Sequence, residues 1–195
     1  MYRQEEKFFF NIENLSYILN YFKAFPINPI RRVNSIYFDT SDLETFNDGE
    51  EGVVPRKKFR FRWYGNSNTI SQNLGSIEIK TTYEHFKEKN TITKKKILEA
   101  KKYFATLLNV KLFPICQISY DRAYYLNDEN YRFTFDYNIQ FKKVGGAIFH
   151  KINQNIFEVK YSSMQSHNIT ISNLADKKTR FSKYNEAILK LCLNY

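Results

Sequence analysis

Residues 57–64 read KKFRFRWY and alternate basic with aromatic side chains. Because successive side chains of a β-strand point to opposite faces, this stretch predicts a strand with one basic and one aromatic face. The basic face would carry Lys58, Arg60 and Arg62. The aromatic face would carry Phe59, Phe61 and Trp63. Such a strand can bury its aromatic rings while it presents its cations together.

The same alternation occurs in several other short stretches. In most of these stretches, charged and polar residues share one face. The face that holds Tyr120, Arg122 and Tyr124 mixes aromatic and basic side chains. The stretches predict strands at 2–10, 33–40, 77–82, 113–126, 131–140 and 156–162. The shared faces hold Arg3, Glu5 and Lys7; Glu78 and Lys80; Arg132, Thr134 and Asp136; and Glu158 and Lys160.

Helical spacing of apolar residues predicts helices at 11–25, 93–109 and 183–193. Pro26 and Pro29 would end the first helix, and lysines would give the second one a basic face. Residues 41–55 are expected to form an acidic loop and residues 65–73 a turn. This order of elements predicts an α+β fold with mostly antiparallel strands, in a single domain spanning residues 1–195.

The composition restricts the class of partner. The chain has 30 Lys and Arg against 20 Asp and Glu, a formal charge of +10, which favours polyanions such as nucleic acid, phospholipid, nucleotides or polyphosphate. Cys116 and Cys192 are too few for a disulfide framework. No signal peptide is recognisable, and no run approaches the about 18 to 20 apolar residues that span a bilayer. We therefore expect a cytoplasmic protein without a membrane segment.

Two arrangements could accommodate the charged faces. An open sheet would turn them to water, whereas a barrel with helices outside would direct them into a lumen. Rows of arginine and lysine repel one another across an open sheet, and outward aromatic faces could cover the apolar stripes of the helices. We therefore expect a barrel whose cationic tunnel requires a bound polyanion.

Eight short motifs then occur in a characteristic order. Together they resemble the VTC polyphosphate polymerase domain of the CYTH, or triphosphate tunnel metalloenzyme, superfamily. The motifs are Arg3-x-Glu5-x-Lys7-Phe8, SIYFDT at 35–40, Lys58-x-Arg60-x-Arg62-x-Tyr64-Gly65, Glu78-Ile79-Lys80, Tyr120-x-Arg122, RFTFD at 132–136, Glu158-Val159-Lys160 and RFSKY at 180–184.

The resemblance implies an antiparallel β-barrel of about eight strands with flanking helices, whose tunnel holds phosphates. It also implies an enzyme that transfers the γ-phosphate of ATP to a growing polyphosphate chain with Mn²⁺ or Mg²⁺. The expected catalytic residues are Arg60, Arg62, Lys80, Arg122 and Glu158, with Glu158 as the metal ligand. Phosphate or nucleotide binding is expected at Lys7, Lys58, Tyr120, Arg132, Lys160, Arg180, Ser182 and Lys183.

Three functions remain open at this point. The first is the polymerase, with ATP and polyphosphate or inorganic triphosphate as partners. The second is a tunnel triphosphatase, although Arg3 stands where the hydrolytic branch has its first Glu. The third is a non-catalytic polyanion-binding module. A stable nucleic-acid partner is not expected, because the rings at 57–64 lie on the face opposite the arginines, where bases could not stack beside them. No regulatory SPX domain, such as eukaryotic members carry, is recognisable.

Overall fold

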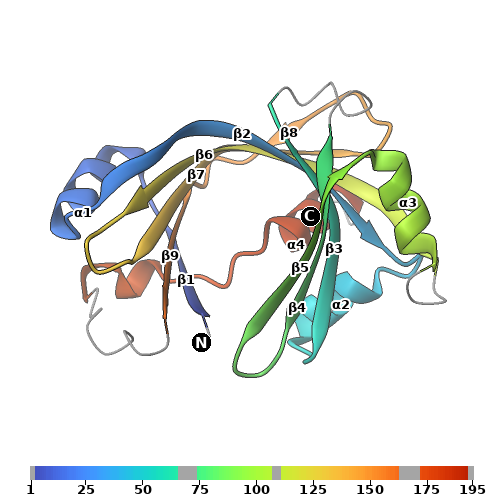
Figure 1. Cartoon of the computed structure of the whole chain (residues 1–195), viewed down its shortest axis with the longest axis horizontal. Coiled ribbons are helices and arrows are strands. Elements are labelled where there is room, and N and C mark those ends of the chain that lie inside the picture. The colour runs from blue at the N-terminus through green and yellow to red at the C-terminus, as the bar shows by residue number, and fades with distance from the viewer. Residues whose placement is uncertain (1–2, 66–73, 107–110, 163–171, 193–195) are drawn as a thin grey trace. The chain divides into compact units, whose positions relative to one another are not determined.

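The computed structural model describes residues 3–65, 74–106, 111–162 and 172–192 (Figure 1). The strands are β1 (Arg3–Phe9), β2 (Phe25–Asp39), β3 (Arg56–Tyr64), β4 (Gly75–Thr82), β5 (Lys87–Lys95), β6 (Phe113–Leu126), β7 (Arg132–Lys143), β8 (His150–Lys151) and β9 (Ile156–Ser162). The α-helices are α1 (Leu15–Tyr21), α2 (Glu44–Glu51), α3 (Ile97–Thr106) and α4 (Lys183–Cys192), with 3-10 helices η1 (Ile12–Asn14) and η3 (Ser172–Lys177).

The strands follow the order β1-β9-β7-β6-β2-β3-β4-β5, and β8 pairs with β7. The pairings β1–β9, β7–β9, β7–β8, β2–β3, β3–β4 and β4–β5 are all antiparallel. Helices flank the sheet, so the predicted α+β fold with antiparallel strands is confirmed.

The chain folds into two compact units, each built from three segments. The first unit comprises residues 1–31, 120–139 and 152–181. The second comprises 32–119, 140–151 and 182–195, so β2, β6 and β7 contribute residues to both units. The single domain expected from the sequence stays a prediction, and the units are described separately below.

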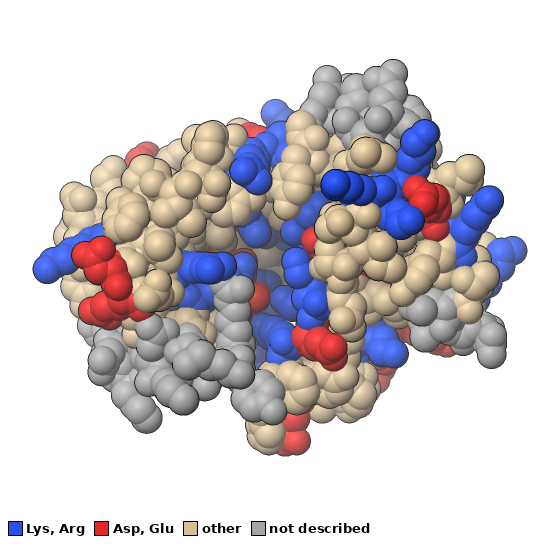
Figure 2. All heavy atoms as spheres, viewed as in Figure 1, with Lys and Arg blue, Asp and Glu red and all other residues tan. Residues whose placement is uncertain are grey.

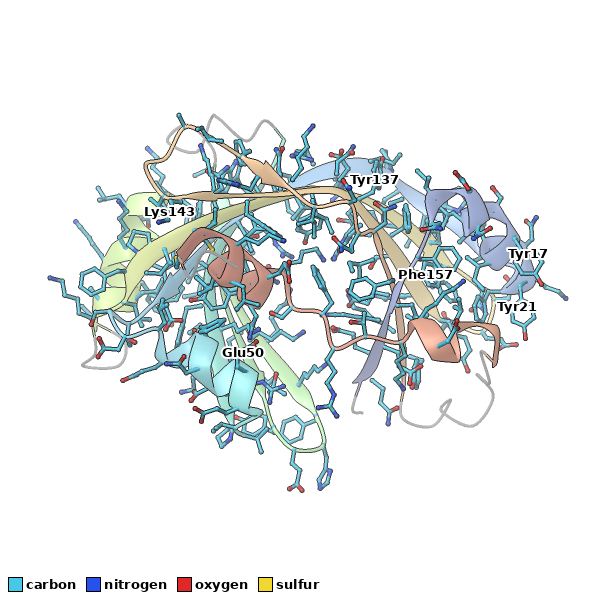
Figure 3. All side chains as sticks on the ribbon, turned by 180° about the vertical axis from the view of Figure 1, so that it is seen from behind. Tyr17, Tyr21, Glu50, Tyr137, Lys143 and Phe157 are labelled. Atoms are coloured by element: carbon cyan, nitrogen blue, oxygen red, sulfur yellow. The ribbon has the colours of Figure 1, made fainter. Side chains whose placement is uncertain are left out.

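The core of the first unit lies on the aromatic faces of β1, β7 and β9. Phe133 and Phe157 are fully buried and stack with ring centroids 5.8 Å apart. Figure 3 shows Phe157 among the side chains of this core. Helix α1 contributes the buried Ile18, with Leu15 and Leu19 packed against the cluster. Tyr17 and Tyr21 of the same helix are exposed (Figure 3).

The core of the second unit covers the aromatic face predicted at residues 57–64. Phe59, Phe61 and Trp63 are at most 2% exposed, which confirms this face. Helix α3 covers it through Ala100 and Phe104 (Figure 1). Gly75 of β4 is required beside these rings, because a Cβ atom there would lie 2.5 Å from Cζ of Phe61.

The first predicted helix is wrong at both ends. Instead of a helix over 11–25, a 3-10 turn leads into α1, and β2 already begins at Phe25. Pro26 and Pro29 lie inside β2, in its exposed first half. A proline favours extended backbone at the residue before it, so these prolines accompany a strand here.

The predicted acidic loop at 41–55 contains helix α2, which the sequence analysis missed. Its first amides bond to Asp39, which precedes it on β2. The predicted helix at 93–109 is also too long, because β5 extends to Lys95 and only Ile97–Thr106 are helical. Lys94 and Lys95 of the predicted basic helix face therefore belong to β5. Most of the predicted turn, residues 66–73, lies outside the described residues.

Candidate functional site

The basic face of β3 is the candidate site of the second unit. Antiparallel register places Lys58 opposite Lys80 of β4, and Arg60 opposite Glu78. On the other side, β2 places Tyr37 opposite Arg60 and Ser35 opposite Arg62. The predicted residues Lys58, Arg60, Arg62 and Lys80 therefore share one surface, which we name the β3 basic face.

Glu78 is the buried carboxylate at the centre of this face. One of its oxygens, Oε2, lies 2.7 Å from Nε and 2.5 Å from an Nη atom of Arg60. Arg62 lies 3.9 Å from the same oxygen, and Lys89 of β5 lies 3.6 Å from Oε1. Burial alone would raise the pKa of Glu78, but these three cations outweigh burial and lower it to about 2. Glu78 is thus ionised and ion-paired.

Neutral oxygens fix the two arginines from the side of β2. Arg60 donates through Nη1 to the hydroxyl of Tyr37 at 3.0 Å, and Arg62 donates through Nε to the hydroxyl of Ser35 at 3.2 Å. The ring of Tyr37 stacks on Tyr184 with centroids 5.0 Å apart. These contacts hold the guanidinium groups without adding negative charge.

Helix α4 places its first turn against Lys58. The ammonium of Lys58 donates to the hydroxyl of Ser182 at 2.7 Å and to Oδ1 of Asn185 at 2.8 Å. Ser182 caps α4, because its hydroxyl accepts the amide of Asn185 at 3.3 Å. Lys183, another predicted residue, is the first residue of this helix and is half-buried.

Glu158 is the centre of another candidate site, which lies in the first unit. Strand pairing places it between Lys7 of β1 and Thr134 of β7. Its Oε1 lies 2.7 Å from Lys160, and its Oε2 lies 3.8 Å from Arg122. Burial raises the pKa of Glu158, but the charges of Lys160, Arg122 and Lys7 outweigh it and hold the pKa well below its usual range. We name this group the Glu158 cluster.

Asp136 completes the Glu158 cluster by binding Arg122. The guanidinium donates to both carboxylate oxygens of Asp136, at 2.5 and 2.6 Å, and lies 5.2 Å from the ring centroid of Tyr120. The role of Asp136, which the sequence left open, is therefore to hold Arg122 in a bidentate ion pair.

The remaining predicted residues of the first unit are less constrained. Lys7 donates to the carbonyl oxygen of Phe181 at 3.0 Å and lies 3.6 Å from Glu5. Arg132, opposite Lys160, and Arg180 are both exposed.

The candidate sites of the two units differ in charge. In the second unit, Arg60, Arg62 and Lys89 form ion pairs with the carboxylate of Glu78, and Lys58 and Lys80 share the β3 basic face with the arginines. In the first unit, four cations (Lys7, Arg122, Arg132 and Lys160) accompany Glu5, Asp136 and Glu158. Figure 2 shows basic side chains as more prominent than acidic ones on the face in view. The β3 basic face thus carries most of the uncompensated positive charge.

Thr134 bears on the question of a metal ion. Its hydroxyl is buried and has no hydrogen-bond partner within the described part of the chain, and it lies opposite Glu158. No group of three or more His, Cys, Asp or Glu residues among the described residues could hold a metal alone. Mg²⁺ commonly takes only one or two carboxylates and completes its shell with substrate phosphates and water. Glu158 and the orphan hydroxyl fit that mode of binding.

The residues of these networks that the sequence analysis did not name as site residues include Ser35, Tyr37, Lys89 and Asn185. Lys89 lies on β5, whose residues are nearly all exposed, so no apolar face marks this strand in the sequence. The others join through contacts between elements.

Comparison with known proteins identifies the family. The family model described as "VTC domain" matches residues 2–112 and 100–192. The chain belongs to the VTC domain family. This confirms the resemblance predicted from the eight motifs. No curated protein matches this VTC domain.

Solved structures show that the fold of this VTC domain also occurs in proteins of low sequence identity. A putative adenylate cyclase from Vibrio parahaemolyticus has a TM-score of 0.61 at 12% identity, covering 96% of this chain and 98% of that one. The PH1819 protein of Pyrococcus horikoshii OT3 has a TM-score of 0.61 at 14% identity, covering 97% and 99%. A putative adenylyl cyclase from Hippeastrum, described as having a dominant triphosphatase activity, has a TM-score of 0.58 at 11% identity, covering 97% and 95%. At these identities the likeness shows a shared fold.

The helices of this VTC domain are short. Among the described residues, none is long and apolar enough to cross a membrane.

Proposed function

We propose that this VTC domain is a polyphosphate polymerase that transfers the γ-phosphate of ATP to the end of a growing polyphosphate chain. The observation that carries the proposal is the β3 basic face. Three cations surround its buried carboxylate, two further lysines share the face, and neutral groups orient the arginines. A cytoplasmic location, where ATP is available, belongs to the same proposal.

Phosphoryl transfer requires positioning and charge neutralisation more than covalent chemistry by the protein. The bond between the γ-phosphorus and the oxygen bridging to ADP breaks, and a new bond forms to a terminal oxygen of the polyphosphate. ADP leaves with the bridging oxygen. Arg60 and Arg62 would bind phosphate oxygens as planar donors, whereas Lys58 and Lys80 would act as point charges.

The Glu158 cluster would contribute in a different way. Asp136 holds Arg122 in a fixed orientation, so Arg122 can meet phosphate with little loss of side-chain entropy. Lys7 and Lys160 would add positive charge, together with the exposed Arg132 and Arg180. We infer that binding of phosphate draws Lys160 away from Glu158.

We further propose that Glu158 binds Mn²⁺ or Mg²⁺, with phosphate oxygens supplying most of the other ligands. When bound, the ion would neutralise charge on the phosphates. The ionised state of Glu158, held by its cationic neighbours, keeps the carboxylate ready for this role.

The second candidate is a triphosphatase, in which water replaces polyphosphate as the acceptor. The Hippeastrum protein of the same fold supports this candidate through its described activity. Both reactions place the same demands on the basic residues, so the product distinguishes them.

The deciding experiment is incubation with ATP and Mn²⁺ or Mg²⁺, with a gel stained for long polyphosphate and an assay for released phosphate. Polymer that disappears in Arg60→Ala/Arg62→Ala and in Glu158→Gln would support the polymerase. Lys101→Ala, which changes an exposed lysine on α3, is the control and should retain activity. Phosphate without polymer would establish the triphosphatase. Binding of tripolyphosphate without either product would establish a binding module.

A further inference from the structure

Asn185, on the first turn of α4, lies outside the motifs that the sequence analysis singled out. We propose that it is a positioning residue that sets the orientation of the Lys58 ammonium for phosphate binding. The inference rests on the proposed function for the identity of the ligand. Its geometric part rests on contacts within the second unit alone.

The side chain of Asn185 is 6% exposed and uses both ends of its amide. Its Oδ1 accepts from the ammonium of Lys58 at 2.8 Å and from the hydroxyl of Ser182 at 2.7 Å. Its Nδ2 donates to Oε1 of Glu50 on α2 at 2.6 Å. Asn185 therefore connects β3, α2 and α4 at one point, and Figure 3 shows Glu50 on α2.

The chemistry of this point favours asparagine over similar residues. An aspartate could accept from Lys58 and Ser182, but it would oppose the carboxylate of Glu50. An aliphatic residue would leave the donors of Lys58 and Ser182 without this acceptor, which is costly at a buried position. Gly49 leaves the required room, because a Cβ atom there would lie 2.7 Å from Nδ2 of Asn185.

Lys58 needs such a restraint more than the neighbouring arginines do. Its flexible side chain lies opposite Lys80, and like charges directly opposite one another repel. Both acceptors, Ser182 and Asn185, are neutral, so these two bonds orient the ammonium without cancelling its charge. The centroid of the Tyr184 ring lies 5.8 Å from the ammonium, and this cation–π contact stabilises the same position of Lys58.

A double-mutant cycle tests the inference, with tripolyphosphate binding measured by titration calorimetry. We expect Lys58→Ala and Asn185→Ala each to weaken binding about tenfold, a change of about 1.4 kcal/mol. If Asn185 acts through Lys58, the double variant should bind about as weakly as Lys58→Ala alone. Losses that multiply to about a hundredfold would overturn the inference, because Asn185 would then act independently of Lys58.

Two further variants guard against a general loss of structure. Glu50→Gln keeps an acceptor for Nδ2 of Asn185 and should retain binding. Asn185→Asp keeps the acceptor for Lys58 but adds a negative charge, so it should weaken binding more than Asn185→Ala does. Equal binding by Asn185→Asp and the unaltered protein would contradict the inference.

The failure of this inference can be separated from failure of the proposed function. Arg60→Ala/Arg62→Ala is measured in the same titration, with Lys101→Ala as the control. If the arginine variant binds tripolyphosphate normally, the β3 basic face is not a phosphate site and both proposals fall. Alternatively, the arginine variant loses binding and the losses in binding free energy at Lys58 and Asn185 are additive. That result would contradict only the proposed role of Asn185.

Discussion

Glu78 and Glu158 show how a single residue can stay ionised while buried. Each is at most 5% exposed, and burial by itself opposes its negative charge. In both cases the surrounding arginines and lysines reverse the direction of the pKa shift. Removal of either carboxylate would leave those cations to repel one another, so each glutamate supports the arrangement of its cluster.

The lowered pKa of Glu78 predicts a pH dependence of stability. Folding lowers the pKa of Glu78 from 4.5 to about 2. The ionised carboxylate therefore contributes fully to the free energy of unfolding above about pH 4.5, and this contribution is lost as the pH falls towards 2. The shift corresponds to roughly 3 kcal/mol. We expect Glu78→Gln to lower the free energy of urea unfolding at pH 7, and the difference from the unaltered protein to shrink at pH 3. A difference that is constant with pH would contradict this.

Removal of the Thr134 hydroxyl should not destabilise the protein, in contrast to removal of the Glu78 charge. Because this hydroxyl has no partner among the described residues, Thr134→Val should leave the free energy of unfolding unchanged or raise it by about 1 kcal/mol without ligand. Thr45→Val is the matched control and should destabilise, because the hydroxyl of Thr45 donates to Asp39 at 2.8 Å. Similar losses in both variants would mean that Thr134 has a partner.

At the scale of elements, Asp39 explains why helix α2 forms where the sequence indicates a loop. It is fully buried and accepts the amides of Thr45 and Phe46 at 2.9 and 3.0 Å. It also accepts the hydroxyl of Tyr184 on α4. A carboxylate on the preceding strand thus caps one helix and fixes another, which local residue patterns do not reveal.

We therefore expect Asp39→Ala to destabilise the protein by about 3 kcal/mol, because several buried donors lose their acceptor at once. Hydrogen exchange should accelerate first at the amides of Thr45 and Phe46. Asp42→Ala, at an exposed position nearby, is the control and should change neither quantity appreciably. Protection that persists at both amides in Asp39→Ala would refute the capping role.

The elements that the sequence predicted well are those whose pattern reflects burial on one face. The strand at 57–64 and the strand at 113–126 alternate clearly and occur as expected. β5 was missed because nearly all of its residues are exposed, so no apolar face marks it. Within the site, Arg60, Arg62 and Glu78 could be grouped by alternation, whereas Tyr37 and Asn185 enter through contacts between elements that are distant in sequence.

At the scale of the whole molecule, the surplus of positive charge affects stability. The formal charge of +10 includes the four cations of the β3 basic face and Lys89, and only three of these five form ion pairs with Glu78. Self-repulsion of this kind is relieved when a polyanion binds. A polyanion that binds only the folded state also raises the melting temperature by mass action.

We expect tripolyphosphate at millimolar concentration to raise the melting temperature by several degrees, and sodium chloride of equal ionic strength to raise it less. In Arg60→Ala/Arg62→Ala, tripolyphosphate and sodium chloride should raise the melting temperature by nearly the same amount. An equal effect of both salts on the unaltered protein would indicate general screening of charge and would contradict specific binding.

The pairing of β1 with β9 has a consequence for how the protein is made. Arg3 lies opposite Ser162, so β1 leaves the ribosome well before its partner strand β9 is synthesised. Contacts between such distant residues carry a high entropic cost of loop closure and slow the folding reaction. While the residues between the two strands are being synthesised, β1 therefore lacks its β9 partner, and a chaperone that binds nascent chains could bind it during that interval.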